Sequence, residues 1–195
     1  THGADGIEDG PRVRHTGNRK VPQPVHWSLL EDAHDRELLT WHSTGQLAVI
    51  DVASRAVRLV GAPTMIRSVD VSPEGTHFRV TRMTTPYSFL VPVSSFGSVQ
   101  ELWDDAGKVV ATLQTTPLRE ETRTGNGPAA PDTGRRNVQW YAAGTGLVYL
   151  KSVIAPASGP NGRARATAVR VLQWRPPYGP GDTTVLFEGG PQLTN

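Results

Sequence analysis

The chain has 195 residues, and its 20 basic and 18 acidic side chains give a formal net charge of +2 at pH 7. The near balance, with Lys and Arg scattered along the chain, argues against nucleic-acid binding, and no apolar run approaches the roughly 18 residues that a membrane helix needs. The chain has no cysteine, which excludes disulfides, thiol nucleophiles and Cys-ligated zinc.

The first 24 residues are rich in Gly, Pro and charge and show no hydrophobic periodicity, which favours a flexible arm or a loop. They lack the apolar segment of a signal peptide. Absence of cysteine does not fix the compartment, since secreted bacterial proteins often lack cysteine too. A bacterial periplasmic or secreted location is the one we favour.

The segment Leu29–Trp41 is the only good candidate for a helix. Acidic residues stand early in it, at Glu31 and Asp32, where the helix dipole favours negative charge. The apolar residues that would lie near one face are Leu29, Leu30, Ala33, Leu38 and Trp41.

From Gln46 onward the pattern changes to strands. Three segments predict hairpins, because β-branched and aromatic residues flank a cluster of turn residues in each. These segments are Leu47–Gly61, Val99–Leu113 with Asp105–Lys108 as its turn, and Thr167–Gly190 with a longer tip rich in Pro and Gly.

A second kind of hairpin occurs twice, at Ser68–Met83 and at Asn137–Ser152. The two segments align without gaps, and Gly75 falls opposite Gly144 at the turn, where we expect a positive φ. The other matched positions are Val69 with Val138, Val71 with Trp140, Thr76 with Thr145, Phe78 with Leu147 and Val80 with Tyr149.

The two kinds of hairpin alternate along the chain, and a four-stranded meander repeated around an axis is a propeller blade. We therefore predict an all-β fold, a partial β-propeller over residues 25–195 with about two and a half four-stranded antiparallel blades and one short helix. Residues 1–24 would be a flexible arm or an interblade loop. The blades at both ends would expose apolar faces. An antiparallel sandwich with two similar hairpins is the alternative.

The sequence offers no catalytic, cofactor-binding or metal-binding residues. It has no Gly-x-Ser-x-Gly motif, no His-Glu-x-x-His motif and no Gly-rich phosphate loop. His34 and His42 fit structural or surface positions, and His77 lies beside a hairpin turn, where we expect it to be exposed.

The remaining polar and aromatic candidates also have structural explanations. Asp104-Asp105 fits a hairpin turn, and Glu120-Glu121, which begins a long loop, fits a solvated position better than a substrate channel. Trp103, Trp140 and Trp174 fit packing between blades. An exposed aromatic strip formed by these three residues would instead support a carbohydrate-binding β-sandwich.

Several segments, in order, resemble the propeller domain of an S9-type (prolyl oligopeptidase family) serine peptidase, of the glutamyl endopeptidase-like branch. The resemblance covers roughly residues 27–152. Two departures fall in loops: Thr84-Thr85 stands before Pro86 where a His-Arg pair is expected, and Phe96-Gly97 where an Arg-Phe pair is expected. The matching segments are Leu29–Val52, Ser68–Met83, Thr85–Val110, Thr116–Glu121 and Gly134–Leu150.

The resemblance implies a propeller that is not itself catalytic. Such a propeller caps an α/β-hydrolase domain that follows it in the chain and carries the Ser, Asp and His of the triad. The cap limits entry to short or unfolded peptides, and the branch implies cleavage after Glu. The expected partners are the rest of the propeller, the hydrolase domain and a peptide, without nucleic acid, membrane or cofactor. A non-enzymatic TolB-like propeller that binds proteins or ligands is the rival.

Overall fold

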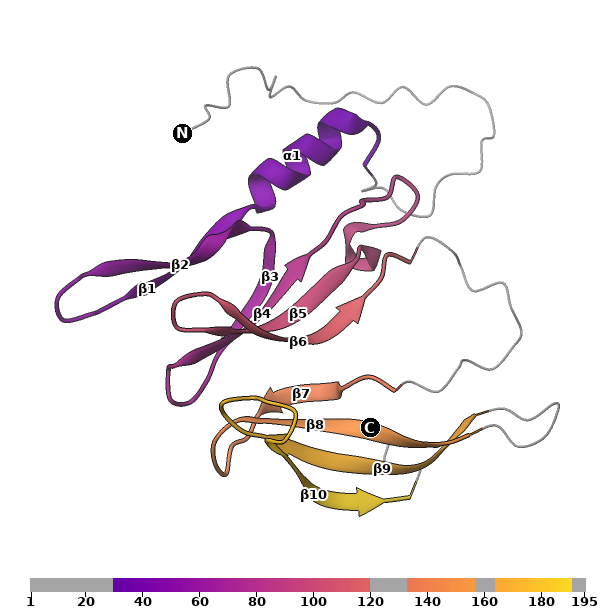
Figure 1. The fold of residues 1–195 in the computed structure, drawn as a ribbon. Coiled ribbons are helices and arrows are strands. Elements are labelled where there is room, and N and C mark those ends of the chain that lie inside the picture. The colour runs from indigo at the N-terminus through magenta and orange to yellow at the C-terminus, as the bar shows by residue number, and fades with distance from the viewer. Residues whose placement is uncertain (1–29, 120–132, 157–163, 191–195) are drawn as a thin grey trace, which may run out of the picture.

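The structure is a computed structural model that describes residues 30–119, 133–156 and 164–190. Over these ranges the chain forms one α-helix, α1 (Ala33–Ser43), one short 3-10 helix, η1 (Val93–Ser95), and ten strands (Figure 1). The arm predicted for residues 1–24 lies outside the described residues. No helix in the described part is long and apolar enough to cross a membrane.

The strands form three antiparallel sheets, none of them closed. The predicted β-rich fold with one short helix and all five predicted hairpins are confirmed, whereas the propeller itself remains a prediction. The first sheet is the hairpin β1 (Gly45–Ile50) and β2 (Val57–Thr64). The second contains β3 (Ile66–Val71), β4 (His77–Met83), β5 (Ser98–Asp104) and β6 (Val109–Thr116). The third contains β7 (Arg136–Trp140), β8 (Leu147–Ala155), β9 (Arg165–Trp174) and β10 (Thr183–Gly189).

The internal repeat predicted from the sequence is present in the strand register. In the β3–β4 hairpin the last residue before the turn, Val71, pairs with Phe78, and in the β7–β8 hairpin Trp140 pairs with Leu147. The backbone hydrogen bond that closes each turn is also repeated, at 2.9 Å in both hairpins. The second and third sheets are thus two copies of one four-stranded meander, joined in the same order.

The two turns differ in the glycine that bends them. Gly75 has a φ of 72°, as expected, but in the second turn the positive φ of 88° belongs to Gly146, so the expectation for Gly144 is wrong. A Cβ atom at Gly146 would lie 2.1 Å from the carbonyl oxygen of Trp174. The backbones of Gly146 and Trp174 approach so closely that only glycine fits at position 146, two residues after the Gly144 that the alignment pairs with Gly75.

The helix is shorter and shifted relative to the predicted Leu29–Trp41. It begins at Ala33, because the side chain of Asp32 caps it by accepting a hydrogen bond of 2.9 Å from the amide of Asp35. None of its residues is fully buried, and Leu39, rather than the predicted Leu38, packs against a core cluster. The predicted apolar face is wrong at Trp41 too, whose side chain is 47% exposed.

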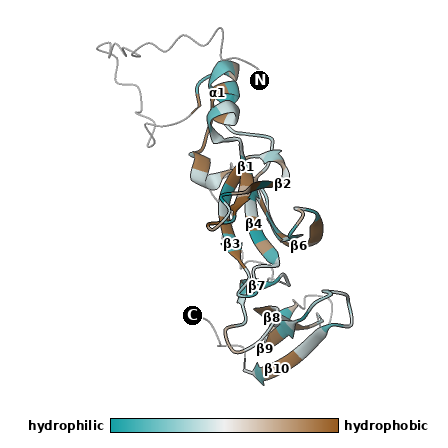
Figure 2. Cartoon of the chain, turned by 90° about the vertical axis from the view of Figure 1, so that its left-hand side faces the viewer, coloured by the Kyte–Doolittle hydropathy of each residue, from teal (hydrophilic) through white to brown (hydrophobic). Residues whose placement is uncertain are grey.

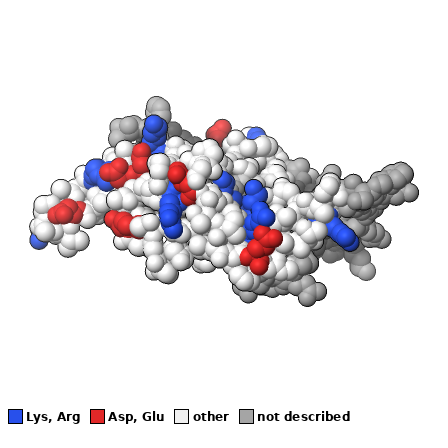
Figure 3. All heavy atoms as spheres, turned by 60° about the horizontal axis from the view of Figure 1, so that its bottom comes forward, with Lys and Arg blue, Asp and Glu red and all other residues white. Residues whose placement is uncertain are grey.

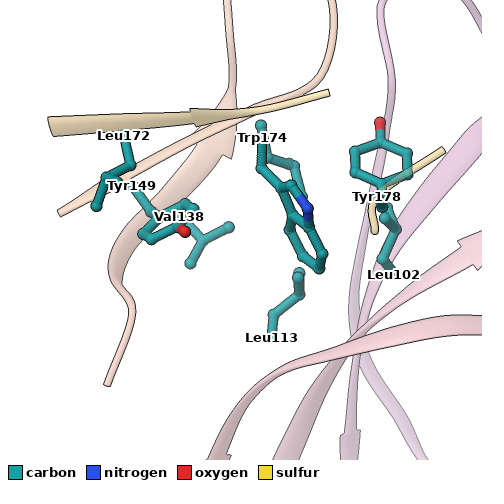
Figure 4. Packing of buried hydrophobic residues seen from close by; sticks show 8 residues of the cluster. Leu102, Leu113, Val138, Tyr149, Leu172, Trp174 and Tyr178 are labelled. Carbon is teal, nitrogen blue, oxygen red and sulfur yellow. The ribbon is translucent and has the colours of Figure 1, made fainter. Parts of the chain in front are cut away.

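Two apolar layers hold the three sheets together in series. The first lies between the β1–β2 hairpin and the second sheet and contains Val60, Phe78, Val80 and Trp103. The second lies between the second and third sheets (Figure 4). Its buried members are Leu102, Leu113, Val138, Leu147, Tyr149, Leu172, Trp174 and Tyr178.

The second sheet therefore packs against an apolar layer on each face, whereas each end sheet packs against only one such layer and has apolar side chains in solvent. Hydrophobic residues run along the strands of each sheet (Figure 2). The exposed ones include Ile50, Val57 and Leu59 on the β1–β2 hairpin and Val185, Leu186 and Phe187 on β10. This confirms the expectation that the end sheets would present apolar surface.

The tryptophans take part in these layers. Trp103 and Trp174 are only 4% and 6% exposed, and the half-buried Trp140 packs against the second layer. They thus pack in the apolar layers, as expected, whereas the identity of the sheets as blades remains a prediction. They form no exposed aromatic strip, so the feature that would have supported a carbohydrate-binding sandwich is missing.

Candidate functional site

The described residues contain no group of three or more His, Asp or Glu side chains placed to hold a metal ion. His34 and His42 are exposed near opposite ends of α1. His77 is half-buried, because its ring meets the edge of Tyr178 with centroids 5.2 Å apart. The predicted exposure of His77 is wrong, since the tip of the β9–β10 hairpin reaches across to cover it.

Of the carboxylate pairs considered in the sequence analysis, Asp104-Asp105 lies in the described part of the chain, and Asp104 stabilises the turn that follows it. Asp104 accepts hydrogen bonds at its Oδ1 from the amides of Ala106 and Lys108, at 3.0 and 2.8 Å, which confirms its predicted place in the turn. The pair Glu120-Glu121 lies outside the described residues.

A buried acid that the sequence analysis did not single out is Glu101, which is 5% exposed on β5. Its Oε1 accepts from Arg82 Nη2 at 2.8 Å, and its Oε2 accepts from Arg82 Nε at 3.0 Å and from the Trp103 indole at 2.9 Å. Burial alone would raise the pKa of Glu101. The hydrogen bonds from Arg82 and Trp103 and the charge of Arg82 outweigh this effect, so the pKa lies below its ordinary value. With both oxygens engaged, Glu101 is a structural anion.

A groove of about 780 Å³ lies between α1 and the loop that follows β4. Trp41, Pro86 and Tyr87 contribute apolar surface to it, and Arg36 lines it while stacking on the ring of Phe89 at 4.9 Å. Its loop wall contains Thr85, one of the two residues before Pro86 at which the sequence departs from the pattern that it resembles. We name it the helix groove.

A second groove, of about 570 Å³, lies between β6 of the second sheet and β8 of the third. Three cationic side chains line it, at Arg119, Arg135 and Lys151, and no Asp or Glu of the described residues does. Four threonines are among its other lining residues, Thr112, Thr115, Thr116 and Thr133. We call it the cationic groove.

Elsewhere the surface charges are mixed. Figure 3 shows positive and negative side chains interspersed on the face turned forward, without a broad field of one sign. Three ion pairs of the described residues account for part of this mixture, Arg79 with Asp70, Arg82 with Glu101 and Arg170 with Glu188. None of them includes a cation of the cationic groove.

Two curated plant proteins are similar to this chain. A "Probable glutamyl endopeptidase, chloroplastic" of Oryza sativa subsp. japonica is 27% identical over 147 residues, which is 73% of this chain and 15% of the rice protein. A protein of the same name from Arabidopsis thaliana is 29% identical over 140 residues, 70% of this chain and 14% of that protein. No family model and no solved structure matches.

The chain thus spans only a small part of the relatives that it matches. At this distance, the similarity indicates a peptidase-related family.

Proposed function

We propose that this chain is a non-catalytic segment of a β-propeller that gates and scaffolds an S9-type serine peptidase, which hydrolyses peptides after Glu. The observation that carries the proposal is the repeated meander. Two sheets of four strands have the same order and the same turn register, and an apolar layer stacks one on the other. Blades of a propeller pack face to face in this way.

Burial supports the same assignment. In a propeller each interior blade is covered on both faces by its neighbours. The second sheet packs on both faces here, and in the proposed propeller the β1–β2 hairpin would be the outer half of a preceding blade. The exposed apolar residues of the β1–β2 hairpin and of β10 are the surfaces that further blades would cover.

The proposed reaction, hydrolysis of peptides after Glu, comes from the names of the relatives. The sequence of this chain indicates that its own residues do not carry out that reaction. Both relatives are named glutamyl endopeptidases. This chain has no Gly-x-Ser-x-Gly motif to supply a nucleophile, and the carboxylate of Glu101 is already saturated with hydrogen bonds. The nucleophile would therefore come from a hydrolase domain outside the present sequence.

The test uses the parent polypeptide that contains this chain, beside the chain alone. A fluorophosphonate probe should label the parent and leave the chain unlabelled. The parent should cleave a short peptide that contains Glu faster than the same peptide with Gln in its place. It should not cleave a folded protein that contains Glu residues, because the propeller would keep a folded protein out. A parent that takes no label and cleaves neither peptide would favour the non-enzymatic TolB-like propeller.

A further inference from the structure

We propose that the cationic groove is a binding site for carboxylates, and that it receives the acidic side chain of a peptide. The choice of a peptide as the ligand rests on the proposed function. The site itself rests on the position of Arg135, which the structure places at the entrance to β7, where the second and third sheets meet.

Arg135 is held in place by aromatic rings. The centre of its guanidinium lies 4.6 Å from the ring centroid of Trp174 and 5.4 Å from that of Tyr149. Stacking on two rings fixes the plane of the guanidinium before any ligand arrives, so little side-chain entropy remains to be lost on binding. Both rings belong to the apolar layer between the sheets.

Among the described residues, the guanidinium of Arg135 has a single hydrogen-bond acceptor. A guanidinium carries five N–H groups. Arg135 uses one nitrogen, Nη1, to donate to the carbonyl oxygen of Thr112 at 3.2 Å. Its Nε is buried without a hydrogen-bond partner in the described part of the chain. A guanidinium with a single protein acceptor keeps further N–H groups for an anion with two acceptor oxygens.

The surroundings select for negative charge. Lys151 stands two residues after Tyr149 on β8 and lines both the cationic groove and the hollow next to it on the third sheet. Arg119 adds a third cation from the end of the second sheet. No carboxylate of the described residues lines either hollow, so the charge that these residues place there is positive.

The geometry favours a carboxylate over a phosphate. Phosphate sites are usually built from backbone amides at Gly-rich turns and helix N-termini. The described lining residues come from β6, from β8 and from the loop segments beside them, and no helix N-terminus is among them. A planar guanidinium beside a lysine matches the planar, singly charged end of Glu or Asp.

The test is a titration of the isotope-labelled chain, followed by NMR at constant ionic strength. A blocked Ala-Glu-Ala peptide should shift the backbone amides of Thr112 and Lys151 saturably, and Ala-Gln-Ala should bind at least about fivefold more weakly, because only the former offers a charged acceptor. Inorganic phosphate is titrated separately. Equal binding of the two peptides, or shifts confined to other strands, would overturn the proposal, and so would phosphate binding tenfold tighter than the Glu peptide.

Variants assign the binding to the groove. Arg135→Gln should abolish the shifts, but it also removes the stacking on Trp174 and could disturb the fold. Lys151→Gln changes an exposed residue and should weaken binding of the Glu peptide about two- to fivefold. The matched control is Lys108→Gln, an exposed lysine in the β5–β6 turn, which should leave binding unchanged. Equal behaviour of the two lysine variants would refute the site.

The experiment distinguishes this proposal from the proposed function. It measures binding by the chain and not hydrolysis by the parent. Loss of binding would leave the propeller assignment standing, and an inactive parent would leave the carboxylate site standing.

Discussion

At the scale of single residues, the most constrained side chain is Glu101. It holds the guanidinium of Arg82 and the indole of Trp103 in one buried network. We expect Glu101→Ala to lower the free energy of unfolding by about 3 kcal/mol, because the change leaves a cation and an indole N–H without their acceptor. Chemical denaturation measures the loss. Gln100→Ala on the same strand is the control and should cost well under half as much.

The same network makes stability depend on pH with a defined sign. Hydrogen bonds and the charge of Arg82 lower the pKa of Glu101 below its ordinary value of 4.5. Its contribution is therefore complete above that value and disappears as the pH falls through the lower pKa of the folded state. The stability gap between the wild type and Glu101→Gln, which cannot titrate, should be constant near neutrality and narrow below about pH 4. A gap that widens on acidification would contradict the assignment.

Gly146 and Gly75 offer a matched pair of turn positions. Both have a positive φ, but a Cβ at Gly75 meets nothing within 4 Å, whereas one at Gly146 would lie 2.1 Å from the Trp174 carbonyl oxygen. Gly75→Ala should therefore cost about 1 kcal/mol, the penalty of the left-handed conformation alone. Gly146→Ala should cost at least twice as much, since backbone must move. Thermal unfolding compares them, and equal costs would argue against the close approach.

At the scale of elements, the decisive contact is the apolar layer between the second and third sheets. Leu147 on β8 is fully buried there, whereas Leu186 on β10 is 41% exposed. Leu147→Ala should lower the free energy of unfolding by about 2–5 kcal/mol, and Leu186→Ala by about 0.5 kcal/mol or less. If the sheets are coupled as one unit, amide exchange on both of them should accelerate in Leu147→Ala. Acceleration limited to the third sheet would show that the layer does not couple them.

Which elements form could be predicted from the sequence, because their causes are local. Alternating apolar residues and turn clusters predict the hairpins, and the gapless alignment matches Phe78 with Leu147 because each one follows its turn at the same distance. Asp32 and Asp104 were correctly assigned to a helix start and a turn, since such side chains bind amides only a few residues away.

Features that depend on neighbouring sheets could not be predicted in this way. The helix groove needs α1 to lie against a loop some 45 residues later, and Trp41 therefore faces that groove and not a core. Arg135 reads as part of a loop until the rings of Tyr149 and Trp174 are placed beneath it. Gly146 takes the positive φ because of Trp174, which stands on another strand. The spacing of residues along the sequence does not show which of these distant residues come into contact.

At the scale of the whole molecule, the order in which the three sheets stack determines which faces are buried and where the cationic groove forms. Each sheet contributes one face to a neighbour, and only the middle sheet has neighbours on both sides. The cationic groove lies at the seam between two sheets, where side chains from both can meet around one ligand. The stacking of the second and third sheets therefore both buries the apolar layer between them and brings the walls of this groove together.

The exposed ends lead to a prediction about association. On the outer face of the β1–β2 hairpin, Val57 and Leu59 are 62% and 60% exposed, and Phe187 on β10 is 55% exposed. Apolar surface of this kind pairs with similar surface when no covering blade is present. Sedimentation velocity should therefore show concentration-dependent association of the isolated chain.

Leu59→Lys should weaken that association at least about tenfold, since burying one leucine contributes about 1.5 kcal/mol or more and a buried lysine opposes contact. Leu90→Lys is the matched control, because Leu90 is 70% exposed but lies in the loop between β4 and β5, away from the end sheets. If both lysine variants dissociate equally, the contact is not made by the β1–β2 face. A chain that stays monomeric at every concentration would mean that the end sheets do not attract a partner, and that would remove the physical reason for expecting further blades against them.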